Sequence, residues 1–404
     1  MIDQDYRFSV ISATVYGPEH VSTVMDWDQR RCYTISGSTT FMPPDEDLEI
    51  GFLKRHINHL APNVRSITID DKGLLVTVSS DPEDDATLAP HYPRYSSVQS
   101  LQDCPTIELS KLTELDRFSP RVDLMSYVDE DGVQRKVAFK YTITFQWRNQ
   151  IWDEMHVVKS IPAHPNIVPF DHIVIDPVES RVVGFTTTFI PGGTLDSNKT
   201  RVFRLEWLQQ LTNVVDYLNL ELGIIHQDIA PRNLLIDPAT NNLRLFDFDR
   251  AARVGKPGVC TERDDIVGVI FTLYEIITQD EHYREVCFEQ RDVETVHNLE
   301  VWPVKTELDC DVSLFRKHLN CWVQSRRARA AQNQPAETTV DVPDMPPSSP
   351  LRTGYDDSGE PILVEDPAPR RTEALQGGKN VMHWERAPYE QAYGQECVKN
   401  EALQ

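Results

Sequence analysis

The sequence predicts an α+β protein made of several parts, and three observations lead to this expectation. The 404 residues are enough for about two to three domains, and a hydrophobic content of 40% is enough to build buried cores. Strand-like and helix-like patterns alternate along the chain. In the middle, a helical pattern, a polar loop and two short strands follow one another between residues 205 and 249.

Composition narrows the classes of partner. The chain carries 63 acidic and 40 basic side chains, a formal net charge of -23, which repels phosphate backbones and anionic lipid surfaces. We therefore expect neither a nucleic-acid nor a membrane partner. The seven cysteines are scattered without the close pairs that metal sites or disulfide frameworks use, so they are interpreted as reduced thiols.

Targeting signals are not evident in the sequence. The opening MIDQDYRFSV is acidic where a secretory signal needs a basic and then an apolar stretch. The longest apolar run, residues 267–277, is too short to cross a bilayer and contains Glu275, which favours a buried helix. The expectation is a monomer that is intracellular, either cytoplasmic or nuclear.

Residues 1–80 predict a small α+β module of unknown role. PPDEDLEIGFLKRHINHLAP offers Asp45 as a helix N-cap, followed by apolar residues at helical spacing. SITIDDKGLLVTVS, residues 66–79, alternates apolar and polar positions around a turn at 71–73 and predicts a hairpin. No chemical motif falls in this module.

Two further segments look non-globular. Residues 81–104 begin with a polar, aperiodic and proline-bearing stretch that predicts a linker. Within residues 331–404, the stretch from Pro335 to Pro369 holds eight of the 27 prolines among acidic and hydroxyl side chains, which predicts a disordered tail. The aromatic HWERAPYEQAY near its end has two interpretations, a docking segment or an unstructured terminus. The remaining domain covers residues 105–330.

The middle of that domain carries the chemistry. A helical pattern ends at Gly223 and delivers the chain to IIHQDIAPRNLLID, and LLID with NNLRLFDFD predicts a hairpin. Asp228 and Asn233 therefore lie on a loop, and Asp247 lies at the far end of the hairpin. Such oxygen-bearing groups suit phosphoryl transfer, in which a carboxylate orients a hydroxyl and other oxygens hold Mg²⁺ on nucleotide phosphates.

These residues resemble the protein-kinase family. HQDIAPRN resembles the catalytic loop HRDLxxxN, and DFD at 247–249 resembles D-F-G; upstream, KVAFK resembles the motif VAIK, and HPNIVPF matches the turn after the αC helix. The resemblance implies that Asp228 is the catalytic base and that Asn233 and Asp247 bind Mg²⁺. It also implies a bilobal fold, with a β-rich N-lobe at about 105–190 and a helical C-lobe at about 191–330.

The resemblance assigns further roles. Lys140 ends an apolar strand, where its ammonium reaches ATP phosphates, and Glu154 on the next helix holds that ammonium. Ala138 leaves room for adenine, and Arg232 supplies charge to the transition state. Residues 263–278 resemble the buried αF helix, with Asp265 as its acidic anchor. Taken singly, Lys140, Glu154 and Asp265 are also ordinary strand-end, helix-face and N-cap residues; their order favours the kinase interpretation.

The sequence departs from the family at several points. LDRFSPRVDLMSY, residues 115–127, has no glycine where the family has a glycine-rich loop over the phosphates. Asp249 replaces the glycine of D-F-G, and Gln227 replaces an arginine that clamps phosphorylated activation loops. Only residues 248–264 separate Asp247 from Asp265, and no A-P-E occurs there.

Three functions remain open at this point. The first is an active protein kinase that moves the γ-phosphate of ATP to a protein hydroxyl, Ser or Thr rather than Tyr, with ATP and Mg²⁺ as cofactors and an unidentified protein substrate. The second is a pseudokinase scaffold, favoured by the missing glycines and the short segment. The third is a small-molecule kinase of the aminoglycoside or choline type, which also lacks an A-P-E.

Overall fold

The computed structural model describes residues 1–330, 340, 342–347, 351–356, 359–365 and 368–393. The chain forms two compact units. Unit 1 contains residues 1–149 and 172–186 together with the segment from residue 345 onward, and unit 2 contains residues 150–171 and 187–344. Unit 1 is built mainly on β-sheets and unit 2 mainly on helices, so the mixed α+β fold class predicted from the sequence is confirmed.

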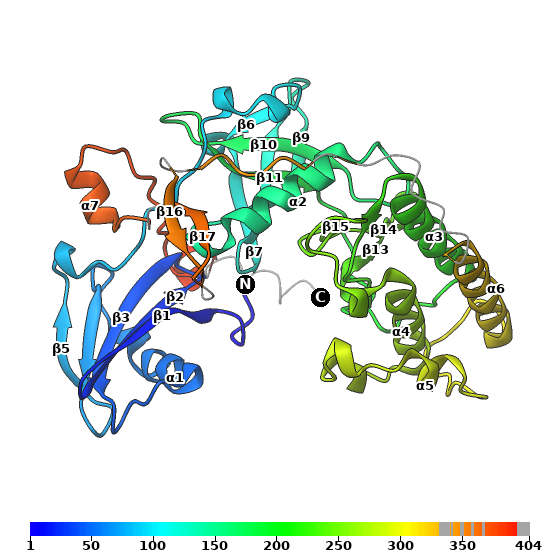
Figure 1. Ribbon diagram of the computed structural model, residues 1–404, viewed down its shortest axis with the longest axis horizontal. Helices are drawn as coiled ribbons and strands as arrows, with labels where there is room; N and C mark the ends of the chain where they lie inside the picture. The colour runs from blue at the N-terminus through cyan, green and yellow to red at the C-terminus, as the bar shows by residue number, and fades with distance from the viewer. Residues whose placement is uncertain (331–339, 341, 348–350, 357–358, 366–367, 394–404) are drawn as a thin grey trace. The chain divides into compact units, whose positions relative to one another are not determined.

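The first part of unit 1 is a five-stranded sheet with one helix. The strands lie in chain order: β1 (Phe8–Tyr16), β2 (Glu19–Asp26), β3 (Arg31–Ser38), β4 (Ser66–Ile69) and β5 (Leu75–Ser79). Helix α1 (Glu46–His56) links the parallel pair β3 and β4 and packs against the sheet (Figure 1). Asp45 caps α1 by accepting the Leu48 N–H at 3.1 Å, as the sequence predicts.

The second part of unit 1 is a six-stranded sheet. Its order is β6 (Thr106–Glu108), β10 (Phe170–Ile175), β11 (Val182–Thr188), β9 (Gln134–Tyr141), β8 (Val122–Val128) and β7 (Thr113–Ser119). Strand β11 approaches β9 closely, because a Cβ added at Gly184 would lie 2.1 Å from the Lys140 carbonyl oxygen. This glycine fixes the backbone of the strand that carries Lys140.

Residues 81–104, expected to be a linker, are instead an ordered part of unit 1. Tyr92, Val98 and Leu101 are buried, and Arg94 forms a β-bridge with Arg181. Short 3₁₀ turns at Pro82–Asp84, Tyr95–Ser97 and Gln99–Leu101 carry the chain. Aperiodic, proline-bearing sequence gives no strand or helix signal, but three apolar side chains are enough to anchor it.

The expectation of a disordered tail over 331–404 does not hold for residues 368–393, which are folded into unit 1. This segment contains α7 (Arg371–Gln376) and α8 (Tyr389–Tyr393), and it follows a hairpin of β16 (Arg352–Tyr355) and β17 (Pro361–Val364). Trp384 is 8% exposed and stacks on Tyr141 at 5.2 Å between ring centroids. The other parts of the predicted tail, 331–339, 341, 348–350, 357–358, 366–367 and 394–404, lie outside the described residues.

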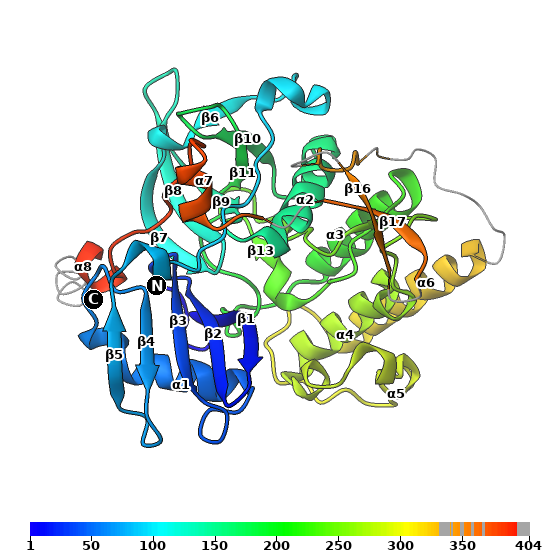
Figure 2. The ribbon, with the colours of Figure 1, turned by 60° about the vertical axis from the view of Figure 1, so that its left-hand side comes forward.

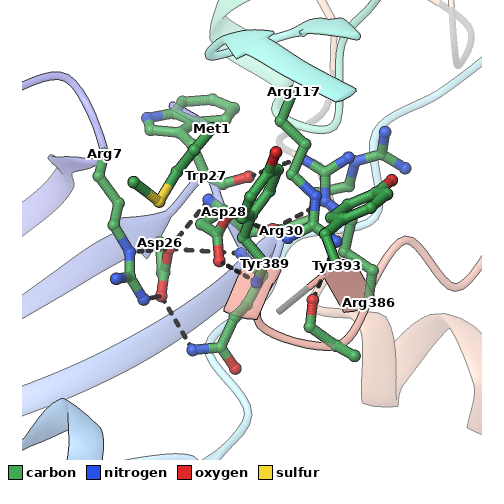
Figure 3. Close-up of polar contacts among 12 residues, drawn as sticks. Met1, Arg7, Asp26, Trp27, Asp28, Arg30, Arg117, Arg386, Tyr389 and Tyr393 are labelled. Carbon is green, nitrogen blue, oxygen red and sulfur yellow. Dashed lines mark hydrogen bonds and ion pairs between the residues drawn. The ribbon is translucent and has the colours of Figure 1, made fainter. Parts of the chain in front are cut away.

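A buried ionic network joins the tail to both sheets of unit 1 (Figure 3). Arg117, 1% exposed, donates to the Asp28 carboxylate at 2.9 Å, to Glu114 at 2.8 Å and to the Ala387 carbonyl at 3.0 Å. Arg386 donates to Glu114 at 2.6 Å. We call residues 368–393 the strap, because they tie the first sheet to the β7–β8 hairpin.

The strap also completes the hydrophobic core between the sheets. Trp384 belongs to one buried cluster with Met25 and Trp27 of the first sheet and with Phe139 and Tyr141 of β9. The face of β9 opposite Lys140 is therefore covered by side chains from distant parts of the chain. Aromatic stacking and charge-assisted hydrogen bonds hold this segment, although its composition is poor in aliphatic residues.

Unit 2 is a helical domain with short strand pairs (Figures 1 and 2). Its helices are α3 (Leu205–Asp216), α4 (Asp265–Thr278), α5 (Val293–His297) and α6 (Val312–Ala330), and α2 (Arg148–Ser160) lies in it from Gln150 onward. The short strands are β12 (Ile224–Ile225), β13 (Leu234–Ile236), β14 (Leu243–Leu245) and β15 (Ala252–Arg253). Helix α3 buries Leu208, Leu211, Val214 and Val215, the face predicted by the 3.6-residue spacing.

Within the described residues, none of the helices is long and apolar enough to span a lipid bilayer.

Candidate active site

The predicted loop lies between α3 and the β13–β14 hairpin of unit 2. Helix α3 continues into a π-helical turn, Tyr217–Glu221, and Gly223 reverses the chain at φ 65° before β12. Residues 226–233 form the loop, which ends in a 3₁₀ turn at Pro231–Asn233. Strands β13 and β14 then pair antiparallel, so the sequence-predicted hairpin is present.

Three predicted site residues meet on this loop. The Asn233 side-chain amide donates to Asp228 twice, at 2.9 Å to the carbonyl oxygen and at 2.8 Å to Oδ2. Arg232 forms an ion pair with Asp228 Oδ1 at 2.5 Å. Asp228 is 7% exposed, so its carboxylate is held by two partners in a nearly closed pocket. Because Asn233 Nδ2 is directed at Asp228, its Oδ1 is the atom that can accept a ligand.

One face of helix α4 packs against the loop and supports it. The buried Asp265 accepts the backbone N–H groups of His226 at 2.8 Å and Gln227 at 2.7 Å. One turn further on, a Cβ added at Gly268 would lie 3.0 Å from Ile229 Cβ, so the helix and loop touch there. Thr272 Oγ1 donates to the Ile229 carbonyl at 2.9 Å. Residue 265 thus holds the loop at 226 and 227, and residues 268 and 272 both contact it at 229.

The Asp265 carboxyl sits in an environment that resists its charge. Complete burial raises its pKa, and the partly opposing effects are His226, the Asn219 amide and the two backbone N–H groups. Asn219 Nδ2 donates to Asp265 at 2.8 Å. An anchor with this many donors fixes the backbone that precedes Asp228.

Gln227 fastens the short segment that follows DFD. Its Nε2 donates to the Arg250 carbonyl at 2.7 Å and to the Gly258 carbonyl at 3.0 Å, and its Oε1 accepts the Cys260 N–H at 2.5 Å. Strand β15 of the same segment pairs with β12. The segment is therefore tied down by a neutral amide at the position where the sequence suggests that family members use arginine.

The DFD stretch has a constrained backbone. Asp247 adopts φ 67°, a left-handed conformation that costs a non-glycine residue free energy. Next to it, the Phe248 N–H donates to Glu154 Oε1 at 3.1 Å, and the Phe248 ring lies 4.7 Å from the His226 ring. Gln150 Nε2 donates to Asp249 Oδ2 at 2.9 Å. Glu154 and Asp247 are thus linked through Phe248.

Lys140 and Ala138 belong to unit 1, on strand β9. Lys140 is 8% exposed and lies opposite Val122 in the β8–β9 pairing. The β7–β8 hairpin, at the position of the family's glycine-rich loop, turns at 120–121, where Arg121 adopts φ 69°. The left-handed position that would suit glycine is therefore occupied by arginine.

The structure brings Asp228, Arg232 and Asn233 into direct contact and links Asp247 with Glu154. Sequence analysis missed three features of the loop: the contacts of Gln227, and the supporting positions Gly268 and Thr272. A glycine inside the apolar helical pattern at 265–278 is the one available signal, because such a glycine usually marks close packing.

Among the described residues, no group of three or more His, Cys, Asp and Glu side chains gathers to hold a metal. Asn233 and Asp247 together offer one amide oxygen and one carboxylate. Mg²⁺ in nucleotide sites commonly takes one or two protein oxygens and completes its shell with phosphates and water. This donor set fits Mg²⁺ carried by a nucleotide and does not fit a site that the protein fills alone.

The loop with Asp228 and Asn233 is thus anchored by a buried aspartate of the apolar helix α4, and comparison with known proteins identifies the family to which this arrangement belongs. The protein kinase domain family matches residues 125–327, which is 203 of the 404 residues. The chain therefore belongs to the protein kinase domain family.

Individual relatives are more distant. CBL-interacting serine/threonine-protein kinase 24 of Arabidopsis thaliana is 33% identical over 129 residues, covering 30% of this chain and 28% of the relative. CBL-interacting protein kinase 24 of Oryza sativa subsp. japonica is 31% identical over 131 residues, with the same coverage. Serine/threonine-protein kinase CHK1 of Saccharomyces cerevisiae is 43% identical over 47 residues, 12% of this chain and 9% of the relative. The chain thus spans under a third of each of these relatives.

Proposed function

We propose that this protein is a kinase that transfers the γ-phosphate of ATP to a serine or threonine hydroxyl of a protein. The observation that carries the proposal is the fixed carboxylate of Asp228, held by Asn233 and Arg232 on a loop anchored by Asp265. Phosphoryl transfer depends mainly on positioning and charge stabilisation, which is what such a rigid loop supplies.

Asp228 orients the acceptor hydroxyl and takes its proton. Oδ2 is bonded to Asn233, so the carboxylate cannot rotate freely, and Arg232 at its other oxygen keeps positive charge beside the reacting groups. Asn233 Oδ1 and Asp247 would hold Mg²⁺, which neutralises phosphate charge when bound.

The nucleotide side of the site is formed by β9. Lys140 would contact the phosphates from a strand whose position is fixed by Gly184, and Ala138 would leave space for adenine. The β7–β8 hairpin has no glycine amides to approach the phosphates, so we expect weak Mg-ATP binding that depends strongly on Lys140.

Substrate class follows from the relatives and the fold. Two of the three named relatives are serine/threonine-protein kinases by name.

The second candidate is a pseudokinase scaffold, which is favoured by one observation: Arg117 of the hairpin is buried in the network with Asp28 and Glu114, where a flexible phosphate loop would be expected.

Paired measurements on Asp228→Asn and Lys140→Met test the proposal. Phosphate transfer to a protein pool, autophosphorylation and ATP hydrolysis report turnover, and calorimetry reports Mg-ATP affinity. We expect Asp228→Asn to lower turnover by about a hundredfold or more with unchanged ATP affinity, and Lys140→Met to abolish most binding. Asp131→Asn, on an exposed turn of unit 1, is the matched control and should leave both unchanged.

Each alternative gives a distinct result. A pseudokinase shows no turnover in any form of the protein, with partner binding unaffected by Asp228→Asn. A small-molecule kinase transfers phosphate to aminoglycoside or choline acceptors and leaves the protein pool unlabelled. Wild-type turnover that Asp228→Asn retains at the same rate contradicts the assignment of the base.

A further inference from the structure

A small cavity opens beside Asp228 within unit 2. Its volume is about 140 Å³, and its wall includes residues of the loop 226–233 and of helix α4. Four guanidinium groups line it, and two of them have carboxylate partners in the same wall: Arg232 pairs with Asp228, and Arg284 pairs with Glu275. The other two, Arg263 just before α4 and Arg291 after it, bring two further positive charges to the cavity, which repel each other unless an anion is present.

The aromatic ring of Phe288 fixes two of these groups. The guanidinium carbons of Arg263 and Arg291 lie 3.7 Å and 4.0 Å from the Phe288 ring centroid, both within cation–π range. Arg291 is further held by its Nε, which donates to the Val286 carbonyl at 2.9 Å. The two positive charges are therefore positioned before any ligand arrives.

The electrostatic environment of Arg291 agrees with this geometry. Its pKa is lowered first by burial and then by the neighbouring charges of Arg232 and Arg263, with Glu275 and Asp228 opposing. Like charges gathered at a partly buried place are uncommon where they serve structure alone.

None of the five acidic residues of the cavity wall is paired with Arg263 or Arg291; Asp228 pairs with Arg232, and the other four have other partners. Glu275 pairs with Arg284, Asp280 accepts the Tyr274 hydroxyl at 3.0 Å, and Asp264 caps α4 by accepting the Ile266 N–H at 2.8 Å. Glu262 accepts the Thr261 hydroxyl at 2.9 Å. In the portion of the chain described, no carboxylate is hydrogen-bonded to Arg263 or Arg291.

We propose that Arg263 and Arg291, with Arg232 at the edge, form a subsite for an anionic side chain of the protein substrate, a carboxylate or a phosphate monoester next to the acceptor hydroxyl. The inference rests on the proposed function, since it places the acceptor at Asp228. It makes the enzyme selective for acidic or already phosphorylated sequences.

The size of the cavity supports this ligand class. A volume of about 140 Å³ has room for several water molecules, and a carboxylate or phosphate group therefore fits this space.

The test compares three serine peptides that differ at one flanking residue: aspartate, asparagine or phosphoserine. Transfer rates are measured for wild type and for Arg263→Gln/Arg291→Gln, with Arg327→Gln on α6 as a control that removes a surface charge outside the cavity. Wild type should prefer both anionic peptides over the asparagine peptide by about tenfold or more in kcat/KM. The double variant should lose this preference while keeping its rate on the asparagine peptide, and Arg263→Lys/Arg291→Lys should restore part of it.

Equilibrium binding of the same peptides, labelled with a fluorophore, separates failure of the subsite from failure of the kinase assignment. Charge-dependent binding that the double Gln variant loses, without any phosphate transfer, supports the subsite and contradicts the proposed function. Transfer without preference for an anionic flank, or a preference that the double variant retains, overturns the subsite alone. Absence of both transfer and charge-dependent binding overturns both. A larger gain for phosphoserine than for aspartate would identify a primed substrate.

Discussion

The loop 226–233 of unit 2 and the β7–β8 hairpin of unit 1 are held in place by different kinds of contact. The loop is held by one helix, with Asp265, Gly268 and Thr272 on a single face of α4, and the hydrogen bonds join residues 39 and 43 positions apart. The hairpin is held by residues much further away in the sequence: Arg117 bonds Asp28 and the carbonyl of Ala387, 89 and 270 positions away. A single helix therefore supports the loop, whereas three regions of the chain support the hairpin.

The difference bears on the proposed function. If the loop binds the reacting groups as proposed, its side-chain identities are fixed by that chemistry. The hairpin lacks glycine, and its outer surface has become an interface for the first sheet and the strap. Distant parts of unit 1 can therefore affect the strand next to Lys140, while the loop of unit 2 depends on α4.

The largest effect is expected from removing the carboxylate at the centre of the unit 1 network. Asp123 is fully buried and pairs with Arg30 and, at 3.0 Å, with Arg386. Asp123→Ala leaves two guanidiniums without this partner and should lower the free energy of unfolding of unit 1 by about 3–5 kcal/mol. Peptide-resolved hydrogen exchange measures this, with exposed Asp131→Ala as control. Equal loss of protection in unit 2 would contradict the confinement of the network to unit 1.

Acidification is expected to act differently on the hairpin network and on the loop support, because the pKa values of Glu114 and Asp265 are shifted in opposite directions. Burial would raise the pKa of Glu114, but Arg386 and Arg117 outweigh it and lower the pKa to about 2, from an ordinary 4.5. Its contribution is therefore complete above about pH 4.5 and is lost as the pH falls towards 2. Asp265 has a raised pKa, so its contribution does not fall with acidification.

We thus expect the strap to loosen in acid before the catalytic loop does. The fluorescence of Trp384, obtained as the difference between wild type and Trp384→Phe, should change between pH 4.5 and 2. Glu114→Gln should remove this transition or weaken it. A Trp384 signal that stays constant until unit 2 unfolds would refute the assignment.

Two helical glycines give smaller effects of opposite sign. Gly268 touches Ile229, so Gly268→Ala should overpack the loop support and destabilise unit 2 by about 1–3 kcal/mol. Gly51 in α1 has open space around its Cβ position, so Gly51→Ala should stabilise unit 1 by about 0.5–1 kcal/mol. Denaturant unfolding followed by segment-resolved exchange checks both. Destabilisation by both substitutions would show that space around the Cβ does not decide the outcome.

The last prediction is that phosphatase treatment has no effect on activity. Gln227 ties residues 250–260 with neutral hydrogen bonds, and no phosphate is needed to order that segment. Phosphatase treatment should therefore leave activity unchanged. Kinase assays before and after treatment, with mass spectrometry of residues 250–262, test this; a large loss traced to a phosphosite there would refute it.

Sequence analysis predicted the parts of the fold that local patterns encode. The Asp45 cap, the hairpins at 66–79 and 234–245 and the buried face of α3 follow from spacing and capping signals, and the structure contains all of them. The meeting of Asp228 with Asn233 also follows from short spacing along one loop.

The strap and the anionic subsite could not be predicted in this way. Arg386 is 272 residues from Glu114, and no periodicity or turn signal connects positions so far apart. Arg232, Arg263 and Arg291 come from three segments whose proximity depends on how the chain packs around α4. Composition predicts disorder for residues 368–393 because they contain few aliphatic side chains. It gives no signal for the stacking of tryptophan on tyrosine or for the buried ion pairs that hold the segment.

The strap also sets the order in which the protein can be made. Tyr141 and Trp384 stack together, yet 243 positions separate them, and translation at about 5–20 residues per second needs roughly 12 to 50 seconds to cover that distance. During this time the apolar face of β9 has no tryptophan to cover it, whereas α3 and α4 of unit 2 are complete in sequence by residue 278. The core of unit 1 can therefore close only after the strap has been synthesised.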